Sequence, residues 1–152
     1  IAHQFGGRYH TPHGLANAIV LPHVLRYSAP DIVPQLARLA LRAGLGTEDE
    51  RDDELAEKFM AGVEQLNRDL GIPETLAALQ DKDIGAIARA ACKEADTYPV
   101  PRYMTVKQCE ALIRKLLPAK AEKPVKAEKA GKTAKPAPAK KVPAKKAARK
   151  ST

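Results

Sequence analysis

Histidine is the residue type whose placement in this chain suggests chemistry. All four histidines of the 152-residue sequence, His3, His10, His13 and His23, lie within its first 23 residues. Imidazole nitrogens are the commonest side-chain ligands of protein-bound metals, and they also serve as general acids and bases. The clustering therefore raises the question of whether these side chains belong to a metal or catalytic site.

His3 and His13 are the pair best placed to share such a site. His3 is expected on a short helix that breaks at Gly6-Gly7, and His13 follows Pro12 at the start of the next helix. A tight turn can bring both rings to one cleft, although the residues alone leave a shared site and two unrelated histidines equally open. Two histidines do not complete a zinc or ferrous iron site, which takes about four ligands, commonly about three of them from protein.

The other histidines and the two cysteines have structural interpretations. His10 is predicted to be a surface turn residue. His23 follows a proline and is expected to bond a freed backbone carbonyl or to pack at a domain seam. Cys92 and Cys109 have neither a CxxC spacing nor a neighbouring His, which argues against a zinc knuckle. They are predicted to be small buried hydrophobic residues in a reducing cytoplasm.

The elements that must position these residues are helices. Apolar residues recur at helical spacing through residues 1–117, and no segment alternates as a strand does. The first long stripe covers residues 13–27, where Pro22 should kink the helix. Asp31 is a plausible N-cap for the helix that follows. We expect five or six helices joined by short turns, and therefore an all-α domain.

Three more helices are predicted further along the chain. The acidic run TEDERDDE suits the positive N-terminal end of a helix that Gly71 and Pro73 close. Another helix should run from about residue 83 to residue 95. After the proline-flanked link YPVPR, Thr105 and Gln108 form a capping box for the last helix. The Leu and Ile stripes of these helices are predicted to form the core.

The net charge of +8 is unevenly distributed. Residues 118–152 hold eleven Lys and one Arg against two Glu, a net charge of +10, which leaves −2 for residues 1–117. This tail is rich in Lys, Ala and Pro and has almost no apolar surface to bury, so we expect it to be disordered. It resembles linker-histone tails in composition, and lysines that neutralise phosphates would give non-specific nucleic-acid contact.

No apolar run approaches the ~18 residues that a membrane span needs, so no membrane partner is expected. The polar N-terminus lacks the apolar region of a signal peptide, and a cytoplasmic location follows as the expectation. The first residue is Ile rather than Met. The chain is therefore expected to begin inside a longer reading frame or after processing.

Three segments carry a resemblance to a known family. AHQFGGRYHTPHGLANAIVLPHVLRYS resembles the signature of the iron-containing alcohol dehydrogenase family, and LNRDLGIPETL and YPVPRYMTVKQCEALI resemble its helical domain and C-terminal end. For residues 1–117 the resemblance implies the helical, metal-binding C-terminal domain of the iron-containing alcohol dehydrogenase and dehydroquinate synthase-like fold, with the N-terminal nucleotide domain missing. Residues 118–152, the predicted disordered basic tail, are not a feature of that family.

The resemblance also implies a chemistry. Family members transfer hydride between an alcohol and NAD or NADP, and one Asp and three His hold iron (Fe²⁺) or sometimes zinc (Zn²⁺). His13, in the PHG motif, matches a metal ligand. His3, in the AHQFGG motif, matches a histidine that lines the nicotinamide and substrate pocket, which makes it the expected catalytic and cofactor-binding residue. The remaining ligands would precede Ile1, and TYPVPRY departs from the Asn-Pro-Arg pattern common near the end of the family.

Three hypotheses follow for the function. The first is the C-terminal part of a metal-dependent, NAD(P)-linked dehydrogenase that oxidises short-chain alcohols or diols or reduces aldehydes, forms a homo-oligomer when intact, and is inactive as this chain alone. The second is a nucleic-acid-binding protein that acts through residues 118–152. The third is a helical remnant that assembles only with partners. The mildly acidic charge of residues 1–117 argues against the second as the main function.

Overall fold

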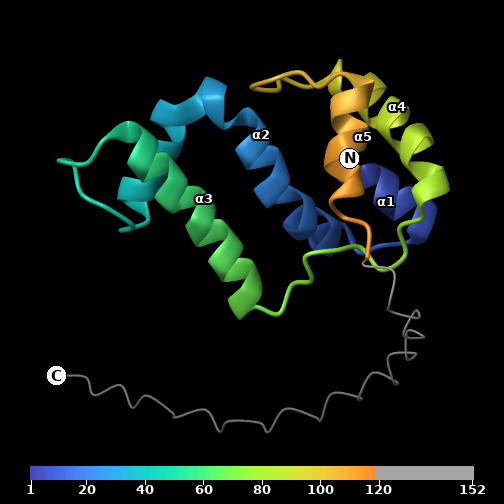
Figure 1. Ribbon diagram of the computed structural model, residues 1–152, viewed down its shortest axis with the longest axis horizontal. Helices are drawn as coiled ribbons and strands as arrows, with labels where there is room; N and C mark the ends of the chain where they lie inside the picture. Colours follow the sequence, from blue (N-terminus) through green and yellow to red (C-terminus); the bar gives the residue numbers. More distant parts are fainter. Residues whose placement is uncertain (119–152) are drawn as a thin grey trace, which may run out of the picture.

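The computed structural model describes residues 1–118, and these residues form an all-α fold with no strand among them. The prediction of an all-α domain is confirmed. Figure 1 shows the arrangement of the helices. In chain order the elements are α1 (Ala2–Tyr9), α2 (His13–Arg42), α3 (Asp52–Asp69), the short 3-10 helix η1 (Asp81–Asp83), α4 (Ile84–Ala95) and α5 (Val106–Arg114).

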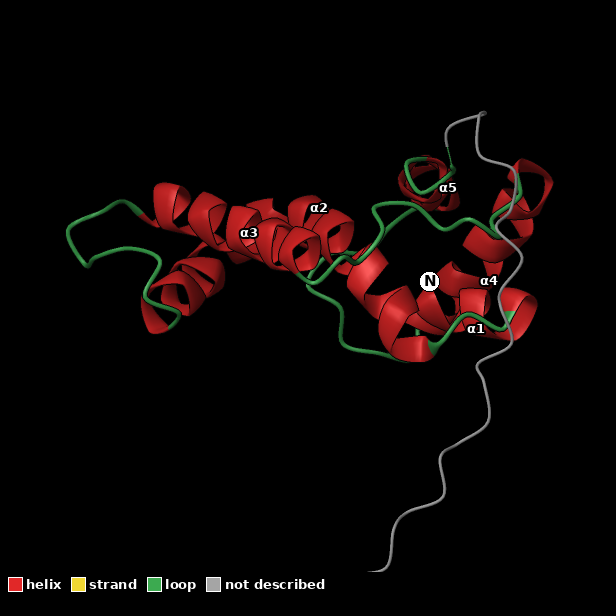
Figure 2. Ribbon diagram, turned by 90° about the horizontal axis from the view of Figure 1, so that it is seen from below, coloured by secondary structure: helices red, strands yellow, loops and turns green. Residues whose placement is uncertain are grey.

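The packing has two parts, which share the long helix α2. The N-terminal half of α2 packs with α1, α4 and α5 around a core that includes Phe5, Ile84 and Ile113, none of which is exposed to solvent. The C-terminal half of α2 packs against α3 through two smaller groups around Leu36 and Leu55. Figures 1 and 2 show α3 beside α2, with α1, α4 and α5 gathered at the other end of the molecule. His3, in α1, and His13, at the start of α2, therefore both belong to the larger part.

Helix α1 continues through the glycine pair where we expected it to break, and it ends at Tyr9. Its last turn is tied to the start of α4, because Tyr9 donates its hydroxyl hydrogen to Asp83 at 2.8 Å and Arg8 pairs with the same carboxylate at 3.0 Å. The chain then turns at His10, whose φ of 54° is left-handed. His10 is exposed, as a surface turn residue should be.

Helix α2 consists of two helical segments that meet at a kink, close to where the sequence predicted one helix to end and the next to begin. Its backbone leaves helical values at Ile32 (φ −135°, ψ 22°) and not at Pro22. Asp31 lies directly before this kink, and its side chain makes no capping hydrogen bond within residues 1–118. Its carboxylate pairs with Arg102 at 3.4 Å, and Arg102 also donates to the Tyr27 carbonyl at 3.1 Å and lies over the Tyr27 ring at 4.9 Å. The bend is thus held from outside, by the loop before α5.

The backbone carbonyl that Pro22 leaves without a partner is satisfied by α3. A proline has no N–H, so the carbonyl four residues earlier, that of Ala18, lacks its helical donor. The side-chain amide of Asn67 donates to this oxygen at 2.8 Å. This was one of the two roles expected of His23, and the structure gives it to Asn67 instead. His23 is half-buried, and burial together with the nearby charge of Lys115 lowers its pKa.

The predictions for the later helices are confirmed at their ends. Three acidic residues occupy the first turn of α3, and the chain turns after it at Gly71, with φ +67°. Thr105 and Gln108 form the predicted capping box of α5. The predicted core includes too many leucines, however. Four of them are at least 45% exposed to solvent: Leu21, Leu39, Leu66 and Leu70.

No helix among the described residues is both long enough and apolar enough to cross a membrane. The predicted disorder of the tail concerns residues that, apart from Pro118, lie outside the described part of the chain.

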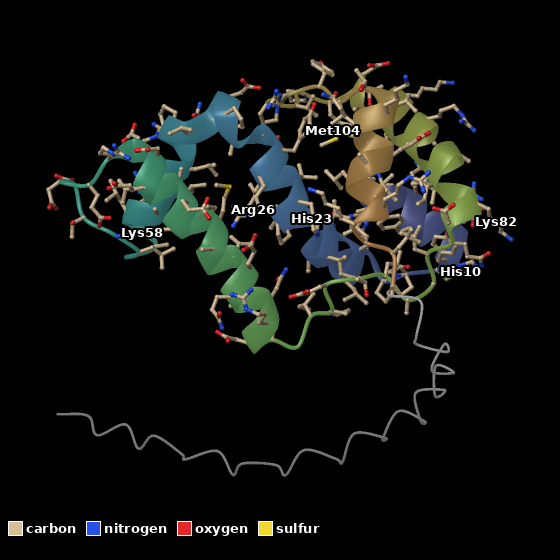
Figure 3. All side chains as sticks on the ribbon, viewed as in Figure 1. His10, His23, Arg26, Lys58, Lys82 and Met104 are labelled. Carbon is tan, nitrogen blue, oxygen red and sulfur yellow. The ribbon has the colours of Figure 1, made fainter. Side chains whose placement is uncertain are left out.

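One ion-pair group joins α2 to α3 and allows a stability prediction. Arg26 lies between the two helices (Figure 3) and forms hydrogen bonds with Glu57 at 3.0 Å and with Glu64 at 2.5 Å. Because these side chains are partly exposed, we expect Arg26→Ala to lower the free energy of unfolding by only about 1 kcal/mol in low salt. Arg38→Ala is the matched control, since Arg38 is exposed on the same helix and has no ion pair within residues 1–118.

The effect of Arg26→Ala should depend on pH. Hydrogen bonds from Arg26 lower the pKa of the Glu64 carboxyl. The stabilisation is therefore present above the ordinary Glu pKa and is lost as the pH falls through the lowered value. Urea denaturation should give a clear difference between Arg26→Ala and wild type at about pH 7 and a smaller one at about pH 3. An equal difference at both pH values would contradict this assignment.

Candidate functional site

The structure brings His3 and His13 together. His3 lies in the first turn of α1, and His13 is the first residue of α2. Their rings stack, with centroids 5.0 Å apart and planes inclined by 23°. The connection between the end of α1 and the start of α2 is three residues long, and the packing of α1 against α2 places the first turn of α1 beside His13. Both side chains are exposed.

Glu94 is the third member of this group. It lies in the last turn of α4, and one carboxylate oxygen accepts a hydrogen bond from Nδ1 of His3. The other oxygen accepts a hydrogen bond from the side chain of Gln4 at 3.3 Å. The hydrogen bond with His3 is also the main reason why the pKa of the Glu94 carboxyl lies below its ordinary value. Three helices therefore contribute to one polar cluster.

The cluster borders a hollow of about 280 Å³, which Asn17 and Tyr98 also line. A larger cavity of about 590 Å³ adjoins it, and Ile1, Ala2, Asn17 and Ala91 line both. The larger cavity is walled mostly by apolar side chains such as Val20, Val24 and Met104. The histidine pair thus lies at a hollow that adjoins a larger and mainly apolar cavity.

The side chains fit one part of a metal site but not a whole one. The exposed imidazole of His13 has the right chemistry for iron or zinc. Within residues 1–118, however, no three His, Cys, Asp or Glu side chains are grouped so that they could hold a metal ion. His3 already uses Nδ1 to bind Glu94. Any metal held by His13 needs further ligands from elsewhere.

The remaining candidates lie apart from this cluster. His10 and His23 do not line the hollow beside His13, and Figure 3 shows both of them. Cys109 is buried and Cys92 half-buried, as expected for small core residues. Burial, followed by the neighbouring Cys92 thiol, raises the pKa of the Cys109 thiol to about 12. The two thiols therefore have the properties of core side chains.

The sequence prediction missed Glu94 and Tyr98. Glu94 is 91 residues from His3 along the chain, and no local pattern links the two positions. One indirect signal was available. A carboxylate in the last turn of a helix faces the negative end of the helix dipole, so a Glu at that position suggests a compensating contact.

The fold and the site define a helical domain that presents a histidine pair but, within its described residues, does not complete a metal site. A family model for the C-terminal part of the iron-containing alcohol dehydrogenases matches residues 1–117. The chain belongs to the iron-containing alcohol dehydrogenase family, whose members are oxidoreductases. Its described residues have the all-α fold of that family's C-terminal domain.

The relatives that this chain matches include named dehydrogenases and reductases. The chain is 39% identical over 108 residues to lactaldehyde reductase of Escherichia coli K12, covering 70% of this chain and 28% of the relative. It is 36% identical over 121 residues to 1,3-propanediol dehydrogenase of Klebsiella pneumoniae, and this match covers 75% of this chain and 30% of the relative. A crystal structure of a 1,3-propanediol oxidoreductase superimposes with a TM-score of 0.71 at 33% identity, covering 76% of this chain and 31% of that one. The chain thus spans about three tenths of the length of these relatives.

Proposed function

We propose that this chain supplies a metal ligand and a pocket histidine to a metal-dependent, NAD(P)-linked alcohol dehydrogenase. The observation that carries the proposal is the stacking of His3 and His13, 5.0 Å apart, at one hollow. Short-chain alcohols or diols, and the corresponding aldehydes, are the proposed substrates. The names of the relatives, which include a lactaldehyde reductase and a 1,3-propanediol dehydrogenase, support this choice.

The two histidines have different roles in this proposal. His13 donates an imidazole nitrogen to Fe²⁺ or Zn²⁺, and the other ligands come from outside the described residues. His3, with Nδ1 engaged by Glu94, keeps Nε2 for the substrate and the nicotinamide. At that nitrogen it can hold or pass on a proton, a contribution on the order of 10²–10⁴-fold in rate. A bound metal ion would supply Lewis acidity toward the alcohol oxygen.

The proposed location is the cytoplasm, and both cysteines are free thiols, in keeping with a reducing compartment. The intact enzyme is proposed to be a homo-oligomer. NAD or NADP would bind mainly to residues outside this chain, because the sequence has no glycine-rich phosphate-binding loop.

A chimera tests the proposed function. Residues 1–117 would replace the matching segment of E. coli lactaldehyde reductase, with which the chain shares 39% identity over 108 residues. We expect the purified chimera, supplied with Fe²⁺, to oxidise 1,2-propanediol with NAD or NADP. The 152-residue chain alone should show no turnover, because hydride transfer needs the nicotinamide held close to the substrate carbon.

Two outcomes would contradict the proposal. One is a correctly folded and assembled chimera that shows no activity with alcohols, diols or aldehydes. The other is measurable turnover by the 152-residue chain alone, because the site would then be more complete than its residues indicate. The natural lactaldehyde reductase, purified and assayed in the same way, is the positive control.

The charge distribution supports a second, additional function. We propose that residues 118–152, with a net charge of +10, bind nucleic acid without sequence preference, while residues 1–117 carry −2. Each lysine that neutralises a phosphate releases a counterion, so binding should weaken steeply with salt. This contact is proposed as an accessory to the dehydrogenase role, not as a replacement for it.

Deleting residues 118–152 should remove DNA binding at low salt and leave the helical fold intact. Retention on a DNA column or a gel-shift titration would measure the binding, and circular dichroism would measure the fold. A control protein with the tail lysines replaced by glutamines should lose binding in the same way. A tail-deleted chain that bound DNA as well as the full chain would place the basic function in residues 1–117.

A further inference from the structure

The contact between Glu94 and His3 joins two helix ends that are far apart in the sequence. One oxygen of the carboxylate binds Nδ1 of His3. The other oxygen accepts a hydrogen bond from the side-chain amide of Gln4 at 3.3 Å. It therefore holds two consecutive side chains of α1. The side chain of His3 is 53% exposed and that of Glu94 28% exposed. An imidazole this exposed would otherwise rotate freely, so the carboxylate limits its orientation.

The backbone under Glu94 is itself fixed. Its carbonyl oxygen accepts hydrogen bonds from the N–H of Thr97, at 3.1 Å, and from the Thr97 hydroxyl, at 2.7 Å. The last turn of α4 is thus closed at the residue that carries the carboxylate. A negative charge at this end of a helix is unfavourable for the helix alone. The bond with His3 provides the compensating interaction.

The orientation of the His3 ring follows from two contacts. Glu94 binds the ring at Nδ1, and His13 stacks against the ring face with an inclination of 23°. A carboxylate accepts hydrogen bonds, so Nδ1 carries the proton of the neutral ring and Nε2 has the lone pair. Within residues 1–118, Nε2 makes no hydrogen bond to the protein. This nitrogen is therefore available to a bound molecule in the hollow.

We infer that Glu94 is the positioning residue of the histidine pair: it sets the orientation and the tautomer of His3 and keeps the ring stacked on His13. The inference rests on the proposed function for the role of His3, but the geometry itself can be tested without enzymatic activity. In this role Glu94 acts through His3.

Nuclear magnetic resonance on the 152-residue chain tests the inference directly. The measurement uses ¹⁵N-labelled histidine at a pH well above the ordinary histidine pKa, so that neutral rings are observed. In the wild type we expect Nδ1 of His3 to have the chemical shift of a protonated nitrogen and Nε2 that of an unprotonated one. Nuclear Overhauser effects should connect the ring protons of His3 and His13.

Glu94→Ala should abolish these ring-to-ring effects and shift the tautomer of His3 toward protonated Nε2. Glu94→Met is the second variant, because it keeps about the length of the side chain but replaces the carboxylate by a thioether, which is only a weak acceptor. Glu94→Asp keeps a carboxylate on a shorter side chain, so it should retain part of the wild-type preference for the tautomer protonated at Nδ1. Asp96→Asn is the matched control, since it removes an exposed carboxylate two residues away and should leave both signals unchanged.

The result that overturns the inference is a folded Glu94→Ala or Glu94→Met chain in which the His3 tautomer and the ring contacts remain those of the wild type. In the active chimera, Glu94→Ala should lower kcat by about tenfold to a hundredfold, as is usual for outer-shell partners of a site, with a smaller change in KM. If the chimera is inactive, the proposed function fails, while the resonance data still decide the role of Glu94.

Discussion

His13→Ala will lower the alcohol dehydrogenase activity of the chimera by more than a hundredfold. Loss of an outer-shell group commonly costs about 10–100-fold in metal affinity or activity, and loss of a ligand should exceed that range. The structure explains the expectation: His13 begins α2, is exposed, and stacks on the pocket histidine His3. Steady-state kinetics with 1,2-propanediol, at saturating nucleotide and with Fe²⁺ present, would measure the change.

His10→Asn is the control for this experiment. His10 lies three residues before His13, is exposed, and has a left-handed backbone conformation with φ of 54°. Asparagine tolerates that conformation well, so the variant should fold and keep its activity. If the His13→Ala chimera and the parent chimera had equal activity, His13 would not be a metal ligand.

Phe5→Ala will have the largest effect on stability. Phe5 is fully buried in the core between α1, α2, α4 and α5. Truncating a buried phenylalanine costs about 3–5 kcal/mol through lost burial and the cavity that remains. Domains of this kind are stable by only about 5–15 kcal/mol, so a large part of the stability would be lost. Because Phe5 and His3 share α1, loss of this packing should also loosen the histidine pair.

Urea denaturation of the 152-residue chain would measure the effect of Phe5→Ala. Phe5→Leu keeps most of the apolar volume and should cost clearly less. Tyr103→Ala removes an aromatic ring that is 62% exposed, and it should change the free energy of unfolding by no more than about 0.5 kcal/mol. A Phe5→Ala value within that same range would show that α1 does not pack as the structure indicates.

Features set by neighbours along the chain could be predicted from the sequence. The capping box of Thr105 and Gln108, the acidic first turn of α3 and the turn at Gly71 all depend on residues within a few positions of each other. Their physical causes, which are unpaired N–H groups, the helix dipole and a positive φ, are local. For this reason the helices from α3 onward were predicted nearly correctly.

Features set by distant contacts could not be predicted in this way. The sequence around Asp31 indicates a helix boundary, and the backbone does kink at Ile32, but the contacts of Arg102 with the Asp31 carboxylate and the Tyr27 carbonyl come from a distant loop. Likewise the carbonyl of Ala18 is satisfied by Asn67, 49 residues further along. Local propensity cannot show which distant side chain will supply such a bond.

The candidate site shows the same division. The resemblance to the family named His3 and His13, and the structure places their rings 5.0 Å apart. Glu94, from α4, could not be predicted because its role appears only when α1 and α4 are packed together. A motif can therefore nominate single residues, whereas the grouping of His3 and His13 with Glu94 becomes visible only in the fold.

Metal content is the most direct test of the central claim, that His13 is a metal ligand and His3 is not. Elemental analysis of the purified chimera should find a stoichiometric amount of iron or zinc. His3→Ala should retain this metal, since Nδ1 of His3 is bound to Glu94. His13→Ala should lose it. A His13→Ala chimera that keeps its full metal content, or a His3→Ala chimera that loses as much metal as His13→Ala, would contradict the account.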